Sequence, residues 1–262
     1  MAEYTKQWLS VEDQVAKLAS RGVGIPEGSS GAQLPRQVGY YRLTGYLYPF
    51  RASETYVDDD GRARVRVLNH YRPGTSIGDA AALIDFERRL RMLILEGIER
   101  IEVSLRMQIG YVLGRRSAFA HLEPGTFVAA FTDPQMDPET GASLPSRHEQ
   151  WTTRIASLNY VRNVAAHHAR IFNRKLVTAP KRPGKGQVPL LDHLRDEESS
   201  KQVFGLYNVL AVMAYLLRTI DPNSAWAGRV VELIGSFPRV GYVTPRSIGV
   251  PDDWTSLGLW QP

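Results

Sequence analysis

The sequence predicts an all-α protein built around a helical bundle, and three observations support this fold class. Apolar residues recur at three- and four-residue steps from residue 76 to about residue 116, which is the period of a helix that buries one face. Residues 199–220 are strongly apolar, as expected of a helix at the centre of a bundle. Residues 58–68 contain an Asp-Gly pair and a strand-like alternation, so one short β-hairpin is compatible with the fold.

Local signals divide this helical chain into three parts. Ser10 with Asp13 forms a capping box that starts a short first helix, and Ser76 with Asp79 forms another that starts the long helix. Aromatic residues crowd residues 40–50, where core packing is the favoured interpretation and base stacking is the alternative. We predict an N-terminal helical and aromatic subdomain (1–75), a helical bundle (76–236) and an irregular C-terminal tail (237–262).

Composition narrows the classes of function. The 262 residues carry a net charge of +5 and include no cysteine. Disulfides, thiolate zinc sites and cysteine nucleophiles are thereby excluded, and a reducing cytoplasm is the expected location. The N-terminus has no signal-peptide pattern, and the longest apolar run, Val203–Leu217, is shorter than the roughly 18 residues of a membrane span. The basic balance favours an anionic partner such as nucleic acid, and no membrane partner is expected.

The most informative stretch is Leu158–Leu176, which is predicted to be one helix with two unlike faces. An apolar stripe comprises Leu158, Val161, Ala165, Phe172 and Leu176. A polar stripe, about 180° round the helix from the first, comprises Asn163, His167, Arg170 and Arg174. From Tyr160 to Gly186 there are seven Lys/Arg residues and no Asp or Glu. Such a surface favours a ligand that carries phosphate.

The residue types on this helix suit RNA cleavage without a metal or another cofactor. RNA carries its own nucleophile, the 2′-hydroxyl, so an enzyme needs a group that moves protons near pH 7 and a cation that stabilises the phosphorane. His167 could supply the first and Arg162 the second. The two residues lie about 140° apart on an ideal helix, so they do not share a face. Either Arg162 reaches round from the flank, or a two-fold dimer completes the site.

The adjacent histidine, His168, better fits a buried structural role, because it lies nearer the apolar stripe beside Ala165 and Phe172. Adjacent histidines do not easily share one ion and no carboxylate is near, so a metal site is disfavoured. The charged face of the long helix is expected to be a solvated ion-pair surface. Three of its residues could instead help to form the site: Arg91, Glu99 and Arg106.

Three separated stretches resemble one known family. They are RNVAAHHARIFNR (Arg162–Arg174), VGYYRLTGYLYPFR (Val38–Arg51) and FERRLRMLILEGIERIEVSLRMQI (Phe86–Ile109). Together they resemble the Abi-like family, the AbiD/AbiF type of bacterial abortive-infection proteins within the HEPN ribonuclease superfamily. The resemblance implies a HEPN-type helical bundle, a homodimer that brings two motifs together and metal-independent cleavage of RNA to a cyclic phosphate. It also implies a role in phage defence through growth arrest.

Carried over to this sequence, the resemblance implies that Arg162 and His167 are the catalytic pair and that Asn163 is the polar residue between them. Residues of the motif and of the basic loop after it would bind RNA: His168, Arg170, Asn173, Arg174, Lys175, Lys181, Arg182 and Lys185. An alternative from another class is that the same surface binds a structured noncoding RNA without cutting it, as a sensor or scaffold. A third alternative, an inert dimerising bundle, predicts no salt-dependent RNA binding.

Overall fold

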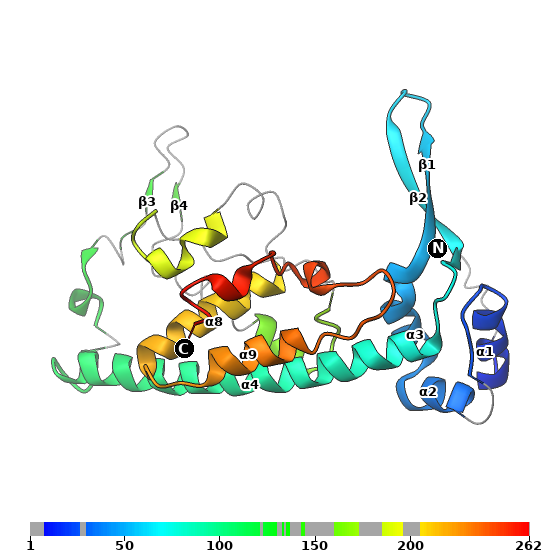
Figure 1. Cartoon of the computed structure of the whole chain (residues 1–262). Coiled ribbons are helices and arrows are strands. Elements are labelled where there is room, and N and C mark those ends of the chain that lie inside the picture. The colour runs from blue at the N-terminus through cyan, green and yellow to red at the C-terminus, as the bar shows by residue number, and fades with distance from the viewer. Residues whose placement is uncertain are drawn as a thin grey trace. The chain divides into compact units, whose positions relative to one another are not determined.

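The structure, a computed structural model, describes residues 8–26, 30–120, 123–129, 133, 135–136, 143–144, 160–172, 185–195 and 205–261. Within these residues the chain is mostly helical and carries one long two-stranded antiparallel hairpin (Figure 1). The prediction of a mostly helical chain with one β-hairpin is confirmed within these residues. The HEPN-type arrangement of the helices stays a prediction. Contacts divide the chain into two compact units, one of Met1–Arg88 with Phe237–Thr244 and the other of Arg89–Ser236 with Pro245–Pro262.

The first unit begins with three short helices and a 3-10 turn: α1 (Val11–Ala19), α2 (Ser30–Val38), α3 (Tyr40–Leu47) and η1 (Tyr48–Phe50). The predicted capping box starts α1, since the Asp13 backbone N–H donates to the Ser10 hydroxyl at 3.0 Å. The core of this unit includes buried side chains from α3 and η1: Leu43, Tyr46, Leu47 and Phe50. The predicted packing role of the aromatic stretch is therefore confirmed in part, because Tyr41 and Tyr48 are exposed.

The hairpin consists of two antiparallel strands, β1 (Arg51–Val57) and β2 (Ala63–Tyr71). The Asp58 carboxylate organises the turn between them, because it accepts hydrogen bonds from the Arg62 backbone N–H at 2.8 Å and from Arg64 Nε at 2.7 Å. The hydrogen bond from Arg64 lowers the pKa of Asp58. Gly61 has a φ of 75°, which is the left-handed conformation that an Asp-Gly turn signal predicts.

One long helix, α4 (Ile77–Gly114), confirms the helical pattern predicted from residue 76 onward. Its capping box is present, because the Ser76 backbone N–H donates to the Asp79 carboxylate at 2.8 Å. Gly97 lies where α4 meets two neighbouring helices. A Cβ atom at this position would lie 2.7 Å from Met213 Cε and 2.8 Å from Trp226 Nε1, so the absence of a side chain permits the close approach.

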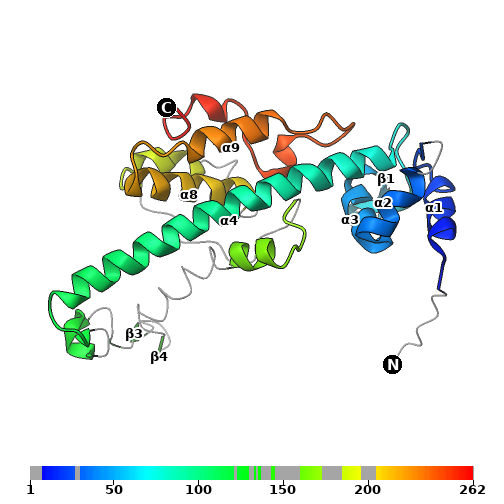
Figure 2. The same ribbon diagram turned by 90° about the horizontal axis from the view of Figure 1, so that it is seen from below.

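The two helices that meet α4 in the second unit are α8 (Leu206–Ile220) and α9 (Trp226–Gly235), seen from below in Figure 2. Trp226 is buried, and its indole N–H donates to the Leu93 carbonyl at 2.9 Å. Arg229 and Glu96 form a bidentate ion pair with two N···O distances of 2.6 Å. The hydrogen bond from Arg229 lowers the pKa of Glu96. Most of α8 is buried, as predicted for the centre of the bundle.

In the second unit the C-terminal segment forms two 3-10 turns, η5 (Pro245–Ile248) and η6 (Trp254–Ser256). Trp260 ties this segment to α8, because its indole N–H donates to the buried Tyr207 hydroxyl at 3.1 Å. Burial raises the pKa of Tyr207 to about 12. The remaining short elements are η3 (Pro124–Thr126), β3 (Gln135–Met136), β4 (Ser143–Leu144) and η4 (Pro189–Arg195). None of the helices that the structure describes is long and apolar enough to cross a membrane.

Candidate functional site

The predicted central helix ends earlier than expected. Residues 160–166 are helical and residues 167–168 form a turn, so the prediction of one helix over Leu158–Leu176 is wrong. Three backbone hydrogen bonds close the helix: His167 N–H to the Asn163 carbonyl (2.9 Å), His168 N–H to the Ala165 carbonyl (3.1 Å) and Ala169 N–H to the Val164 carbonyl (3.0 Å). The last two bonds have the pattern of a Schellman motif, in which the chain reverses out of the helix.

His168 is the residue at which the chain leaves the helix. Its φ of 53° lies in the left-handed region that the first residue beyond such a helix adopts, a position usually occupied by glycine. The prediction that His168 is a buried structural histidine is wrong, because its side chain is exposed. The physical reason is the turn, which redirects the chain before the apolar Ile171 and Phe172 become buried.

The same turn breaks the predicted polar stripe. Asn163 and His167 remain one helical turn apart, but Arg170 follows the turn and does not continue their helix. Asn163 and Arg170 are half-buried, whereas Arg162 and His167 are exposed. Three members of the predicted apolar stripe lie within the described residues and are buried: Val161, Ala165 and Phe172. Phe172 follows the turn, so it does not continue the helical stripe. Leu158, Arg174 and Leu176 lie outside the described residues.

Arg162 and His167 thus occupy two exposed positions, the first within the helical residues 160–166 and the second in the turn that ends them. Because the backbone is helical as far as the His167 N–H, their side chains leave the axis about 140° apart. In the described part of the chain, no hydrogen bond joins the two residues. Among the residues that the structure describes, no group of three or more His, Asp or Glu side chains could hold a metal ion.

Five of the predicted RNA-binding residues lie outside the described residues: Asn173, Arg174, Lys175, Lys181 and Arg182. Lys185 is described, and it is exposed at the start of a turn that leads into η4. The backbone N–H of the next residue, Gly186, donates to both carboxylate oxygens of Asp192 at 3.1 Å. An acidic side chain therefore lies beside the end of the basic segment, although it follows that segment in the sequence.

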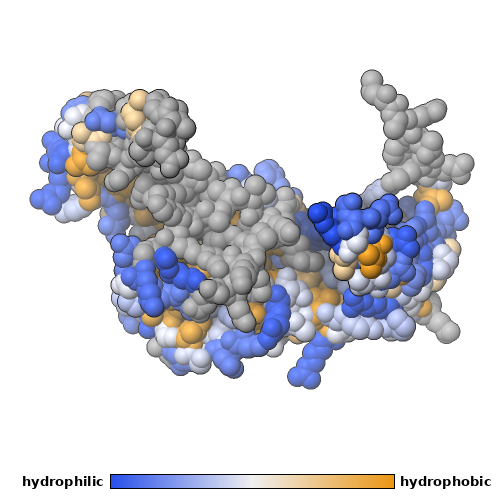
Figure 3. Space-filling view, turned by 90° about the horizontal axis from the view of Figure 1, so that it is seen from above, coloured by the Kyte–Doolittle hydropathy of each residue, from blue (hydrophilic) through white to orange (hydrophobic). Residues whose placement is uncertain are grey.

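The charged face of α4 is largely an ion-pair surface, as predicted. Arg88 pairs with Asp85 at 3.0 Å, and Arg106 pairs with Glu102. Arg91 differs from these residues, since only 6% of its surface is exposed. The space-filling view shows a surface in which hydrophilic side chains predominate between scattered hydrophobic ones (Figure 3).

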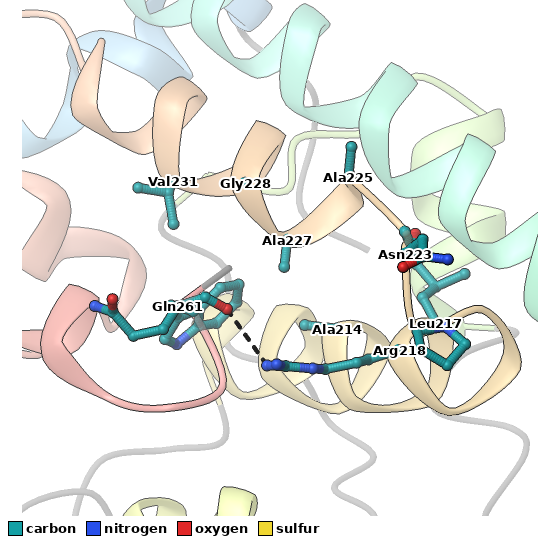
Figure 4. Close-up of a pocket in the computed structure, with 12 residues that line it drawn as sticks. Ala214, Leu217, Arg218, Asn223, Ala225, Ala227, Gly228, Val231 and Gln261 are labelled. Atoms are coloured by element: carbon teal, nitrogen blue, oxygen red, sulfur yellow. Dashed lines mark hydrogen bonds between the residues drawn. The ribbon is translucent and has the colours of Figure 1, made fainter.

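The second unit also contains a cavity of about 560 Å³, which the sequence did not predict (Figure 4). It lies between α8, the turn that follows α8, α9 and the C-terminal segment. None of the residues predicted for RNA cleavage or RNA binding lines it. Ten of its twelve lining residues fall within Ala214–Val231, and the other two, Trp260 and Gln261, come from the C-terminal segment. The cavity therefore depends on how these segments pack, which residue spacing does not show.

The fold and the exposed turn define a mostly helical protein whose candidate site is an accessible arginine and histidine within residues 160–168. The family model described as Abi-like protein matches residues 34–156. The match covers just under half of the chain, and over these residues it confirms the resemblance to the Abi-like protein family. The match includes Val38–Arg51 and Phe86–Ile109, and it ends before Arg162–Arg174. The chain matches no curated protein and no solved structure.

Proposed function

We propose that this protein is a metal-independent endoribonuclease of the HEPN type that acts in abortive infection. Membership in the Abi-like family supports the role in abortive infection. One observation carries the catalytic assignment. Arg162 and His167 are both exposed, and they lie where a helix ends in a Schellman motif. An accessible guanidinium and an accessible imidazole on an ordered backbone are the groups that metal-free RNA cleavage requires.

In the proposed reaction the RNA 2′-oxygen attacks the adjacent phosphorus while the bond to the 5′-oxygen breaks. An imidazole takes the proton of the 2′-hydroxyl, and an imidazolium gives a proton to the leaving 5′-oxygen. The products are a 2′,3′-cyclic phosphate end and a 5′-hydroxyl end. His167 performs the proton transfer, and Arg162 stabilises the negative charge on the nonbridging oxygens through its planar donors.

A homodimer is part of the proposal. Cleavage needs a base and an acid, and two copies of His167, one from each protomer, provide both. The separation of about 140° between Arg162 and His167 on the helix also favours a site that a second copy completes. Asn163 is assigned to positioning, because its half-buried side chain lies between them and its carbonyl accepts the His167 N–H at 2.9 Å.

The test is cleavage of a labelled RNA in the presence of EDTA. Arg162→Ala and His167→Ala are each expected to reduce the cleavage rate by about 10²- to 10⁴-fold, while thermal unfolding stays unchanged because both side chains are exposed. His70→Ala is the matched control, since His70 is an exposed histidine on β2. Undiminished cleavage by the Arg162→Ala/His167→Ala double variant would refute the assignment, and mass spectrometry of the products checks for the cyclic phosphate.

The second candidate function is binding of a structured RNA without cleavage. It is favoured by the exposure of Arg162 and Lys185 at the two described ends of the basic segment. In that case His167→Ala leaves RNA affinity nearly unchanged, whereas Arg162→Ala and Lys185→Ala weaken it additively. Affinity then falls steeply as salt rises, because phosphate contacts release counterions. Measuring cleavage and affinity on the same variants separates the two functions.

A further inference from the structure

The cavity in the second unit has the volume of a small-molecule site. Its volume of about 560 Å³ lies within the range of several hundred Å³ that is typical of small-molecule sites. Small residues make the space, because Ala214 on α8 and Ala227 and Gly228 on α9 line it. A Cβ atom at Gly228 would meet no heavy atom within 4 Å. The side of α9 that faces the cavity is thus left open.

The walls are mostly apolar and are held in place. Leu217, Val231 and Trp260 contribute larger apolar surfaces to the lining. The turn between α8 and α9 is fixed from outside the cavity, because Arg100 donates to the Ser224 hydroxyl at 3.1 Å and to the Asp221 carboxylate at 3.2 Å. A preformed apolar cavity binds a rigid ligand without a large ordering cost.

The charge of the lining is positive. Arg218 is the one charged residue among those that line the cavity. Its Nη1 donates to the carbonyls of Gly258 at 2.9 Å and Gln261 at 3.4 Å, and Figure 4 shows its side chain stretched beside the cavity. A guanidinium has five N–H donors in a planar fork. Both of these contacts use Nη1, and they hold the planar Arg218 guanidinium in position.

We propose that this cavity binds a small anion with a flat apolar body, such as an aromatic carboxylate, sulfonate or phosphate. The apolar body lies between α8, α9 and Trp260, and the anionic group pairs with the Arg218 guanidinium. The proposal does not depend on ribonuclease activity, because the motif residues Arg162 and His167 do not line the cavity.

The first experiment uses 8-anilinonaphthalene-1-sulfonate, an aromatic anion whose fluorescence rises in apolar surroundings, with the full chain. Saturable binding of one molecule per chain is expected. Gly228→Leu should abolish it, since the new side chain fills the cavity, and Gly235→Leu should not, since Gly235 is an exposed residue of the same helix outside the lining. Ala227→Leu provides a second filling variant. Equal binding by both filling variants and the native protein would overturn the proposal.

The second experiment tests the charge. Arg218→Gln is expected to weaken sulfonate binding about tenfold, the effect of a lost charge-assisted hydrogen bond. It should not weaken binding of the neutral analogue N-phenyl-1-naphthylamine, which has the same aromatic body. An equal loss for both probes would mean that Arg218 only shapes the cavity, and the assignment to an anion would be wrong. Thermal unfolding of each variant verifies that the fold is intact.

Discussion

Two helix ends in the second unit are closed in different ways. At the end of α8, one side chain from α4 helps to hold the turn, because the Asp221 carboxylate accepts from Arg100 Nη2 at 3.2 Å. Within the turn, the same carboxylate accepts from the Asn223 backbone N–H at 3.1 Å. At the end of residues 160–166, backbone hydrogen bonds and the left-handed His168 suffice. Arg100 ties the first end to α4, whereas the second end leaves the side chains of His167 and His168 exposed. A turn closed by its own backbone leaves side chains available for function.

The largest expected effect tests the core beside the first helix end, where Trp226 begins α9. Trp226→Ala should lower the free energy of unfolding by about 3–5 kcal/mol, because the buried indole and its hydrogen bond to the Leu93 carbonyl are both lost. Urea unfolding followed by circular dichroism measures the change. Trp8→Ala is the control, since that tryptophan is 87% exposed. A loss below about 1 kcal/mol, within the range of an ordinary surface substitution, would show that the packing of Trp226 against α4 adds little to stability.

The next effect concerns two glycines of α4, Gly97 and Gly110, for which we expect changes in stability of opposite sign. Gly97→Ala should destabilise the protein by about 1–3 kcal/mol through overpacking against Met213 and Trp226. Gly110→Ala should stabilise it by about 0.5–1 kcal/mol, because helix propensity improves and a Cβ atom there meets nothing within 4 Å. Thermal unfolding of the two variants side by side checks the prediction, and equal signs would contradict it.

A smaller effect tests the exposed helix end. His168→Gly should stabilise the protein by up to about 1 kcal/mol, because glycine adopts the left-handed conformation without the steric penalty of a side chain. His168→Ala keeps that penalty and should not stabilise. Calorimetry measures the difference. If the imidazole of His168 has no part in RNA cleavage, His168→Gly also retains activity, and loss of cleavage in this folded variant would give the side chain a direct role.

The smallest effect is a pH dependence at the α4–α9 contact. The pKa of Glu96 is lowered below its ordinary value of 4.5 by the hydrogen bond from Arg229. The pair therefore stabilises the fold at pH values above that ordinary value, and the contribution is lost as the pH falls through the lowered pKa. Glu96→Gln should cost at most about 0.5 kcal/mol at neutral pH, since the pair is partly exposed. This difference should shrink as the pH falls, which urea unfolding at neutral and at acid pH measures.

The features predicted correctly from the sequence are those that neighbouring residues determine. The capping boxes at Ser10 and Ser76 and the Asp-Gly turn at Gly61 are local hydrogen-bonding or backbone signals. The helix end at His168 has no such signal, because a histidine, and not a glycine, occupies the left-handed position that follows the helix. An apolar period that continues to Phe172 then extends the predicted helix too far, although Phe172 is buried after the turn.

The candidate site could be predicted only as a set of residues. The exposure of His167 agrees with the polar stripe predicted for it, and Arg162 is exposed although it was not predicted to lie on that stripe. The burial of Arg91 and the cavity beside Arg218 depend on segments distant in the sequence, so neither follows from spacing. The family match ends before the motif, and the proposed catalytic roles therefore rest on the chemistry of these side chains and await the cleavage assay.

The tip of the β1–β2 hairpin is a suitable place to attach a single fluorescent label. The chain contains no cysteine, and Asp60 lies exposed in the turn that the Asp58 carboxylate organises. An Asp60→Cys variant would carry the sole thiol of the protein. A maleimide fluorophore attached there would report on tumbling and on RNA association with one dye per chain, without a protecting mutation anywhere else.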